Sequence, residues 1–310
     1  MSHNIVVLDG KYANPGDLSW DPLKAFGTTT VYDQTSPDEV ISRSENADIL
    51  IINKIHLGAD QFEQLPQLKL VIISATGMDN VALDAARQYG VTVKNVAGYS
   101  TNSVAQHTFS LLLELTNQVK AHHESVAGGA WDKSKGFSYT LHTIPELSSM
   151  KLAVVGYGQI GQAVAKLGHA FGMSVMVVSQ HATDLEAFEL VSLNKAFQEA
   201  DVVSLHWPMT KDRAGIINKE LLSLMKPTSY LINTARGGLI NEADLLDTLK
   251  ANRIAGAGLD VLSQEPPTTI HPLALLDNCI ITPHIAWASQ ASRRQLLDIV
   301  FQHVEDLNQK

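Results

Sequence analysis

The stretch of sequence that decides the fold is Leu152-Ala153-Val154-Val155-Gly156-Tyr157-Gly158-Gln159-Ile160-Gly161. Its four leading apolar residues predict a short buried strand, and the apolar positions after them, Ile160, Val164, Leu167 and Phe171, recur at helical spacing. In such a turn the first glycine permits a tight reversal, the second lets the backbone approach a pyrophosphate, and the third lets the helix pack closely on the strand. The unpaired N–H groups at the start of the helix favour an anion. We therefore predict that a dinucleotide binds at Gly156, Gly158, Gln159, Ile160 and Gly161; a glycine turn without a ligand is the alternative.

Apolar runs bounded by polar turns surround this motif and predict further buried strands. In the second half of the chain they are Val175–Val178, Val202–Leu205, Tyr230–Ile232, Ala255–Leu259 and Ile280–Ile281. In the first half they are Ile5–Leu8, Ile49–Ile52, Leu70–Ile73 and Val91–Val93, separated by helix-like stretches such as Pro37–Asn46 and Asp79–Tyr89. Strands that alternate with helices form parallel sheets. The predicted fold class is therefore α/β, with two doubly wound parallel-sheet domains.

Two helices indicate how the chain passes between these domains. Ser103–Asn117 is apolar nearly all round, so it is expected to be a buried helix that joins the two sheets. Gln290–Lys310 follows the last strand with amphipathic spacing and is expected to return to the first domain. We expect residues 1–98 with 287–310 to form a flavodoxin-like substrate domain, and residues 99–286 to form a Rossmann dinucleotide-binding domain.

Composition and charge exclude several classes of protein. The 310 residues are 45% hydrophobic and 18% charged, as in globular proteins, and the net charge of −9 comes without a basic stripe that could follow nucleic acid. The sequence has no signal-like N-terminus and no apolar segment of about 20 residues, so we predict a cytoplasmic protein with neither membrane nor nucleic acid as partner. Cys279 is the only cysteine and lies in an apolar run, which predicts a structural role. No metal site is predicted.

The end of the second strand of the dinucleotide unit bears on the choice of cofactor. A site that prefers NAD carries an Asp or Glu there, about 20 residues after the glycines, to bind the ribose 2′-hydroxyl. Here the strand ends with Val178-Ser179-Gln180-His181. Since no carboxylate would repel a 2′-phosphate, the sequence leans slightly towards NADP over NAD, with Ser179 and Gln180 as contacts. The alternative is that these are ordinary polar residues and both cofactors bind.

Three polar segments follow predicted strands of the second half, and they contain Arg236, Glu265 and His284. Reducing a 2-keto acid needs a cation that holds the carboxylate and polarises the carbonyl, and a group that delivers a proton as hydride arrives. Arginine grips carboxylates bidentately, histidine changes charge near neutral pH, and a nearby carboxylate stabilises imidazolium. We therefore predict Arg236, His284 and Glu265 in these three catalytic roles. Each residue alone would be an ordinary loop residue, so the prediction rests on their combination.

With the glycine motif, the segments Thr234–Gly238, Leu259–Pro266 and Thr282–Trp287 resemble the D-isomer-specific 2-hydroxyacid dehydrogenases over nearly the whole chain. The resemblance implies an NAD(P)-dependent oxidoreductase and assigns the same roles to the trio. It also implies that Asp260 contacts the nicotinamide carboxamide, and that His206 and Pro208 lie near the pyrophosphate, where a structural turn fixed by the proline is the alternative. The remaining predicted cofactor contacts are Thr234, Ala235, Arg236, His284 and Ala286.

Substrate contacts are expected from Ser74–Asn80, a loop of small residues after a strand, whose N–H groups could bind a carboxylate. The family uses this segment in that way, so Ala75, Thr76 and Gly77 are predicted to bind the substrate with Arg236 and His284; a plain strand-to-helix turn is the alternative. The runs Ile52–Lys54, Gly98–Thr108 and His284–Ser289 are most similar to the glycerate dehydrogenase or hydroxypyruvate reductase branch. The expected pairs are hydroxypyruvate with D-glycerate, or glyoxylate with glycolate.

Two questions stay open at the level of sequence. A binding protein of the same fold that senses NAD(P)(H) is the alternative function, because a fold does not fix an activity. Members of the family are usually dimers, so a homodimer is expected, and the apolar helix at Ser103–Leu115 could supply either its interface or a core.

Overall fold

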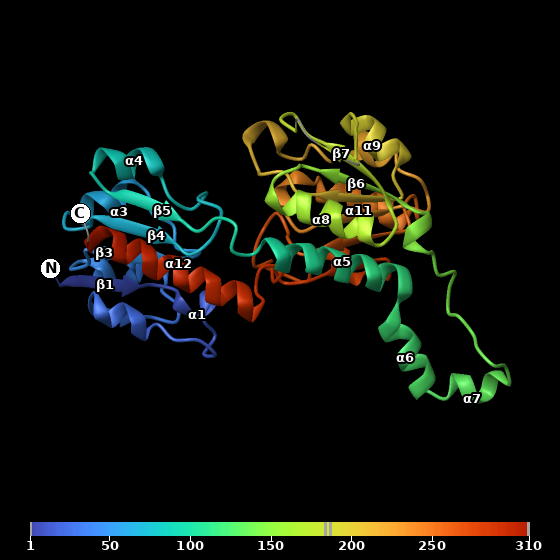
Figure 1. The fold of residues 1–310 in the computed structure, drawn as a ribbon, viewed down its shortest axis with the longest axis horizontal. Coiled ribbons are helices and arrows are strands. Elements are labelled where there is room, and N and C mark those ends of the chain that lie inside the picture. Colours follow the sequence, from blue (N-terminus) through green and yellow to red (C-terminus); the bar gives the residue numbers. More distant parts are fainter. Residues whose placement is uncertain (1, 183–184, 186–187, 309–310) are drawn as a thin grey trace. The chain divides into compact units, whose positions relative to one another are not determined.

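The computed structural model describes residues 2–182, 185 and 188–308, so residues 1, 309 and 310 of the predicted substrate domain lie outside the described part of the chain. The chain divides into two compact units, Met1–Ser100 with Ala288–Lys310, and Thr101–Trp287 (Figure 1). These divisions fall one or two residues after the predicted ones. The assignment of substrate to one unit and cofactor to the other stays a prediction.

The first unit is built on a parallel sheet whose order is β2-β1-β3-β4-β5. The strands are β1 (His3–Val7), β2 (Gly27–Val31), β3 (Ile49–Ile52), β4 (Leu70–Ile73) and β5 (Thr92–Asn95). The helices are α1 (Gly10–Ala13), η1 (Asp21–Ala25), η2 (Pro37–Glu39), α2 (Val40–Ser44), α3 (Ala59–Gln64), α4 (Leu83–Gln88) and α12 (Gln290–Asn308). Every residue of β3 and β4 is buried, as expected for central strands covered on both faces.

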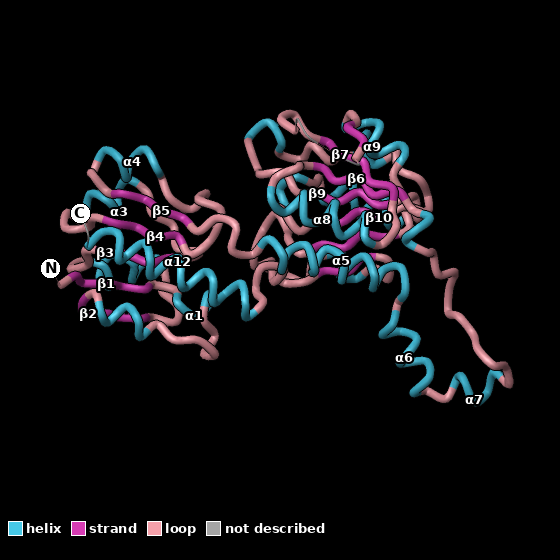
Figure 2. Tube along the Cα trace, viewed as in Figure 1, coloured by secondary structure: helices cyan, strands magenta, loops and turns pink. Residues whose placement is uncertain are grey.

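The second unit holds a larger parallel sheet of order β12-β11-β10-β9-β6-β7-β8 (Figure 2). Its strands are β6 (Lys151–Val155), β7 (Ser174–Val178), β8 (Glu189–Leu190), β9 (Val202–Leu205), β10 (Tyr230–Asn233), β11 (Gly256–Leu259) and β12 (Cys279–Ile281). Its helices are α5 (Thr101–Asn117), α6 (Val119–Ala127), α7 (Ala130–Ser134), η3 (Leu147–Ser149), α8 (Gln159–Ala170), α9 (Leu193–Glu199), η4 (Lys211–Arg213), α10 (Lys219–Leu222), η5 (Gly237–Leu239), α11 (Glu242–Lys250) and η6 (Pro272–Leu275). Among the described helices of the whole chain, none combines the length and apolar character needed to cross a bilayer.

The core of the second unit lies on both faces of its sheet. Leu152 and Val154 pack with α5 and α8, whereas Ala153 and Val155 pack with α9, α10 and α11 on the other face. Successive strand residues point to opposite faces, so this alternation follows from the pleat. Cys279 belongs to the cluster that contains Ala153 and Val155. Burial raises the pKa of its thiol to about 12, so the thiol stays protonated at physiological pH.

The predicted fold class is confirmed, and the structure corrects some of the elements. The sequence analysis missed the edge strands β2 and β8 because neither shows an apolar run: β2 reads Gly-Thr-Thr-Thr-Val and β8 has two exposed residues. The helix expected at Asp79–Tyr89 begins only at Leu83, because Leu57 pairs with the backbone of Asn80 and Ala82 and keeps that stretch extended.

Candidate active site

The turn between β6 and α8 has the geometry of a dinucleotide loop. Gly156 has a φ of +105°, and a Cβ atom there would lie 2.7 Å from the backbone of His206. A Cβ at Gly161 would lie 2.0 Å from the carbonyl oxygen of Gly156, so the close packing of α8 requires glycine. A Cβ at Gly158, by contrast, would meet no described atom within 4 Å. The packing of the chain therefore requires glycine at positions 156 and 161. The exposed Gly158 instead leaves room for a pyrophosphate to approach Gln159 and Ile160 at the start of α8.

Ser179 follows β7 directly beside this turn, since the N–H of Gly156 donates to the carbonyl of Val178 over 2.9 Å. The Ser179 hydroxyl accepts the N–H groups of His181 and Ala182 over 3.2 and 3.1 Å, which fixes a tight turn, and Gln180 is exposed. Ser179 thus occupies the place where a ribose-binding carboxylate would stand in a site that prefers NAD.

His206 lies on the other side of the glycine turn, after β9. Its N–H donates to Val155 over 2.7 Å, and its ring Nε2 lies 2.8 Å from the hydroxyl of Ser204. Burial lowers the pKa of His206 to about 3, so the ring is neutral at physiological pH. His206 can therefore offer a phosphate a hydrogen bond but no positive charge, and Pro208 continues the same loop.

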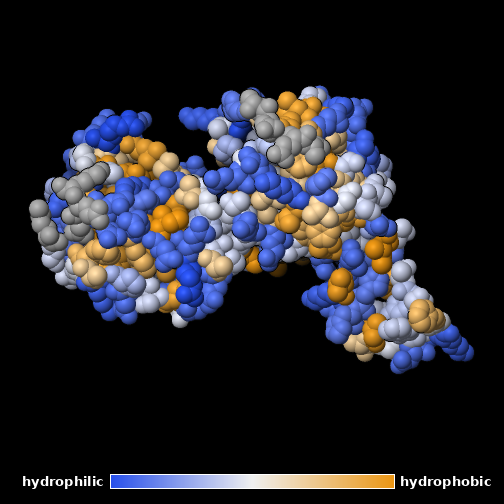
Figure 3. All heavy atoms as spheres, in the orientation of Figure 1, coloured by the Kyte–Doolittle hydropathy of each residue, from blue (hydrophilic) through white to orange (hydrophobic). Residues whose placement is uncertain are grey.

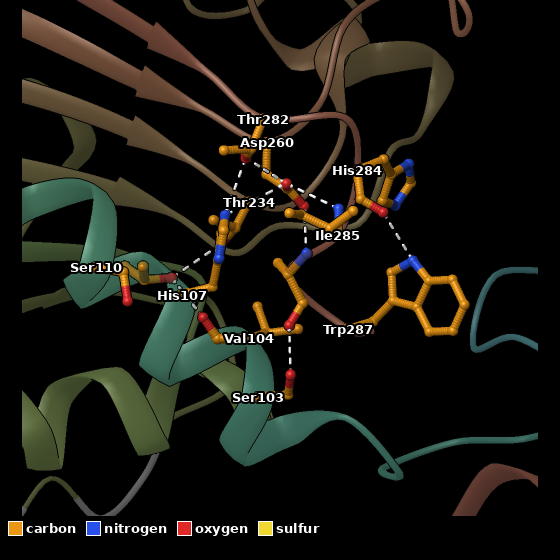
Figure 4. Close-up of polar contacts among 12 residues, drawn as sticks. Ser103, Val104, His107, Ser110, Thr234, Asp260, Thr282, His284, Ile285 and Trp287 are labelled. Atoms are coloured by element: carbon orange, nitrogen blue, oxygen red, sulfur yellow. Dashed lines mark hydrogen bonds and ion pairs between the residues drawn. The ribbon is translucent and has the colours of Figure 1, made fainter. Parts of the chain in front are cut away.

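The catalytic candidates follow three neighbouring parallel strands. Thr234, Ala235 and Arg236 come after β10, Asp260 comes after β11, and the segment from Thr282 to Trp287 comes after β12. Carboxyl ends of adjacent parallel strands share one edge of a sheet, which is where open α/β sheets bind ligands. Figure 4 shows residues from all three strand ends gathered around Asp260.

His284 and Glu265 meet directly. The ring Nδ1 of His284 lies 2.6 Å from Oε2 of Glu265, and both side chains are partly exposed. Within the described part of the chain, Nε2 of His284 makes no hydrogen bond, so it can face a substrate. The φ of His284 is +54°, a left-handed conformation that costs a non-glycine residue about 1–2 kcal/mol. The contact with the carboxylate of Glu265 therefore orients the ring.

Arg236 is joined to the Glu265 loop through its neighbour Gly237. The Cβ that any other residue would place at Gly237 would lie 1.9 Å from the carbonyl carbon of Leu262, so the two backbones touch. The N–H of Leu262 in turn donates to Oε1 of Glu265 over 2.8 Å. Half-buried Arg236 donates from Nη1 to the carbonyl of Ala235 over 2.8 Å. The Arg236 turn and the Glu265 loop are therefore built against each other.

A second carboxylate, Glu242 on α11, supports the same loop. Glu242 accepts the N–H of Ser263 over 2.7 Å and the hydroxyl of Ser263 over 2.6 Å. The ring Nε2 of His271 lies 3.3 Å from it, while the N–H of Leu273 donates to Nδ1 of the same ring. Glu242 and His271 thus fix both ends of the loop that carries Glu265.

Asp260 is 1% exposed and accepts several donors of its own chain. Burial alone would raise the pKa of its carboxyl, but hydrogen bonds from His107, Thr282 and the N–H groups of Ala286 and Ile285 outweigh burial and lower it. The carboxylate is therefore ionised and engaged inside the protein. Its predicted contact with the nicotinamide carboxamide stays a prediction.

The loop predicted to bind substrate belongs to the first unit and is firmly held there. Ala75 accepts the N–H of Val96 over 3.0 Å, Thr76 donates to the carbonyl of Val96 over 3.1 Å, and Gly77 follows in the same loop. The side chain of Asn53 donates to the carbonyl of Ser74 over 2.6 Å. Buried Asp9 anchors Asn53 by accepting its N–H over 2.7 Å.

Sequence reasoning missed the residues that hold the catalytic loops, namely Ser103, His107, Thr282, Glu242 and His271. One signal was present: Ser103 and His107 are polar residues one helical turn apart, so they share a face of α5. Thr282 opens one of the segments that resemble the family, whereas Glu242 and His271 lie in ordinary polar segments. Nothing in the spacing of these three residues reveals their partners.

Comparison with known proteins agrees with this geometry. Residues 109–286 match the family model described as D-isomer specific 2-hydroxyacid dehydrogenase, NAD binding domain. The chain is 40% identical over 308 residues to a hydroxypyruvate reductase of Blautia hydrogenotrophica, covering 97% of this chain and 96% of that protein. It is 41% identical over 277 residues to a glycerate dehydrogenase of Methylorubrum extorquens, covering 88% and 87%.

A solved structure has the same fold. It is an acyclic imino acid reductase in complex with NADPH and D-Arg, which superposes with a TM-score of 0.87 at 30% identity and covers 99% of this chain and 98% of its own. The match to the family model and the two relatives extend the resemblance from single motifs to the whole chain. The chain therefore belongs to the D-isomer specific 2-hydroxyacid dehydrogenase family of oxidoreductases, which act on CH–OH donors.

Proposed function

We propose that the chain reduces hydroxypyruvate to D-glycerate, or glyoxylate to glycolate, with a nicotinamide dinucleotide. The observation that carries this proposal is the 2.6 Å contact between His284 and Glu265 at the sheet edge that also bears Arg236. The names of the two relatives, a hydroxypyruvate reductase and a glycerate dehydrogenase, support this substrate class.

In this reaction Arg236, His284 and Glu265 each have a separate role. The bound dinucleotide supplies the hydride. Arg236 holds the substrate carboxylate through its guanidinium and polarises the neighbouring carbonyl, with Ala75, Thr76 and Gly77 as further carboxylate contacts. His284 donates the proton from Nε2 to the carbonyl oxygen, and Glu265 stabilises the imidazolium before transfer. In the reverse direction the neutral ring of His284 accepts that proton.

The test measures the loss of absorbance of NADPH or of NADH when the purified protein is mixed with a 2-keto acid. The acids, each tested separately, are hydroxypyruvate, glyoxylate, pyruvate and a bulkier 2-keto acid. We expect turnover with hydroxypyruvate and glyoxylate, and slower turnover with the bulky acid. If no acid is reduced while the dinucleotide still binds, the proposal fails and the alternative, a dinucleotide-sensing binding protein, takes its place. We also propose that the reaction takes place in the cytoplasm, with small metabolites as substrate and cofactor.

We propose that NADP(H) is preferred over NAD(H), and Ser179→Asp tests this. The new carboxylate can accept the N–H groups of His181 and Ala182 as the hydroxyl does, so the turn should persist. It would also repel a 2′-phosphate and bind a ribose hydroxyl. We expect the ratio of kcat/KM for NADPH over NADH to fall by about tenfold or more, as one misplaced charge close to a phosphate predicts.

Ser179→Ala is the matched control, because it removes the same turn hydrogen bonds without adding charge. It should lower the ratio of kcat/KM for NADPH over NADH far less than Ser179→Asp does. An unchanged ratio in Ser179→Asp would show that residues elsewhere set the preference.

We also propose that the protein is a homodimer joined through α6, α7 and the segment up to Ile144, which we call the arm. No residue of α6 or α7 is buried, and Figures 1 and 3 show the arm extending from the second unit with apolar side chains on its visible surface. Its exposed large hydrophobics are Val119, Val126, Trp131, Phe137, Leu141 and Ile144. Helices as short as α6 and α7 are unstable unless their apolar side chains pack against another surface, and a second subunit of the same protein can supply that surface. The helix α5 instead packs on β10, β11 and α8 of its own unit.

The double variant Trp131→Asp with Phe137→Asp should therefore dissociate the dimer. Phe137 is 95% exposed and Trp131 is 49% exposed, so charges there cost the folded chain little but oppose an apolar interface. Light scattering should give twice 33.7 kDa for the wild type and 33.7 kDa for the variant. Leu275→Asp, at a residue 71% exposed outside the arm, should leave the wild-type mass. The proposal would be contradicted by a monomeric wild type. It would also be contradicted if Leu275→Asp lowered the mass as much as the double variant does.

A further inference from the structure

Three consecutive backbone N–H groups, beginning with that of His284, donate to one residue. Asp260 accepts three consecutive N–H groups: its carbonyl oxygen takes that of His284 over 2.8 Å, Oδ1 takes that of Ile285 over 2.9 Å, and Oδ2 takes that of Ala286 over 2.8 Å. The left-handed φ of His284 persists because these bonds fix the residues around it. The direction of the imidazole therefore depends on the position of the Asp260 carboxylate.

That carboxylate is held by two side chains that face away from the ring of His284. The hydroxyl of Thr282 donates to Oδ1 of Asp260 over 2.5 Å. Nε2 of His107, on α5, lies 2.9 Å from the Thr282 hydroxyl and 3.4 Å from Oδ1 of Asp260 (Figure 4). Because a hydroxyl has one proton, Thr282 uses it on Asp260 and accepts the N–H of His107. The three groups therefore form a directed chain from His107 through Thr282 to Asp260.

Helix α5 also contacts the segment that follows His284 at a second point. Ser103 lies one turn before His107 on the same face, and its hydroxyl donates to the carbonyl of Ala286 over 2.7 Å. Thr108, next to His107, lies 3.0 Å from the hydroxyl of Thr234, two residues before Arg236. Polar side chains of α5 thus contact the loops that carry both His284 and Arg236.

We propose that His107 and Thr282 are positioning residues for proton transfer: they hold the Asp260 carboxylate, which fixes the turn at His284 and so aims its Nε2 atom at the substrate. Neither residue touches the ring of His284. This inference rests on the proposed reduction of a 2-keto acid with His284 as proton donor. It predicts that loss of the chain slows proton transfer far more than it weakens dinucleotide binding.

The experiment compares variants that remove each hydrogen bond with variants that keep it. Thr282→Val and His107→Leu remove the hydroxyl and the ring N–H at similar volume. Thr282→Ser keeps the hydroxyl, and His107→Gln places an amide N–H near the position of Nε2. Ser110→Ala, at an exposed residue of the same helix, is the control. For each protein one measures kcat, KM for hydroxypyruvate, the solvent deuterium isotope effect on kcat, the dissociation constant of the dinucleotide and Tm.

We expect Thr282→Val and His107→Leu to lower kcat by about 10- to 100-fold, the effect of a small misplacement of a catalytic group. The solvent isotope effect should rise because proton transfer becomes slower, while the dissociation constant of the dinucleotide should rise by a much smaller factor than the one by which kcat falls. Thr282→Ser and His107→Gln should recover most of kcat. The double variant His107→Leu with Thr282→Val should be about as slow as Thr282→Val alone, because both changes break one chain.

The possible results separate this inference from the proposed function. An inactive wild type would overturn the proposed function and the inference with it. An active wild type whose removal variants keep kcat and the isotope effect would overturn the inference alone. The same holds if Thr282→Ser and His107→Gln are as slow as the removal variants, because packing rather than hydrogen bonding would then be responsible.

Discussion

Replacing His284 by alanine is expected to lower kcat for hydroxypyruvate by about 10²- to 10⁴-fold, the usual contribution of a general acid or base. The ring is held by Glu265 over 2.6 Å, and the substitution removes the proton donor that the proposed mechanism uses. The dissociation constant of the dinucleotide should change far less than kcat, because the glycine turn between β6 and α8 and most other predicted cofactor contacts stay in place. Single-turnover kinetics with a separate binding titration measure both quantities.

His169→Ala is the matched control for this change. His169 is exposed in the last turn of α8, beside the amino ends of β6 and β7, and lies at the opposite edge of the sheet from the catalytic loops. Its removal should leave kcat unchanged. If His284→Ala keeps wild-type turnover, the proton comes from another group and the proposed mechanism is wrong.

Gly237→Ala is expected to lower kcat/KM by about 100-fold, although it adds a single methyl group. Its Cβ would lie 1.9 Å from the carbonyl carbon of Leu262 and 2.4 Å from the nitrogen of Ser263, so backbone must move. Either the Arg236 turn or the Glu265 loop would shift, and a displacement of about 1 Å in a catalytic group can cost 10²-fold in rate. Steady-state kinetics with hydroxypyruvate measure the loss.

The neighbouring glycine supplies the control. A Cβ at Gly238 would meet the terminal methyl group of Met209 at 3.0 Å, and that flexible side chain can move aside. Gly238→Ala should therefore retain activity near that of the wild type. Equal losses in the two variants would mean that the contact between Gly237 and Leu262 has no special role in placing Arg236 and Glu265.

The sequence predicted the central strands well because their signal is local. Ile49–Ile52, Leu70–Ile73 and Val202–Leu205 are buried on both faces, so each is a continuous apolar run whose bounds match the structure. β2 and β8 lie at sheet edges, where burial does not select apolar residues. The glycine motif was equally readable, because its constraint acts between residues a few positions apart.

The site could be predicted only in part. Arg236, Glu265 and His284 belong to segments with a recognisable residue order, so the sequence points to them. His107 and Thr282 are 175 positions apart, and Glu242 and Ser263 are 21 apart. Contacts over such separations are created by the packing of α5 and α11 against strand ends. No local pattern encodes them, and they appear only once the fold is known.

The path of α12 has a consequence for synthesis on the ribosome. This helix buries Leu296, Leu297, Val300 and Val304 in the first unit, and its Arg293 forms a bidentate ion pair with Asp17. The first 100 residues therefore leave the exit tunnel long before the helix that completes their core. The second unit is continuous from Thr101 to Trp287 and can finish folding first. The part of the chain before Thr101 is thus completed after the unit that follows it, and its apolar surface stays partly uncovered until α12 has been made.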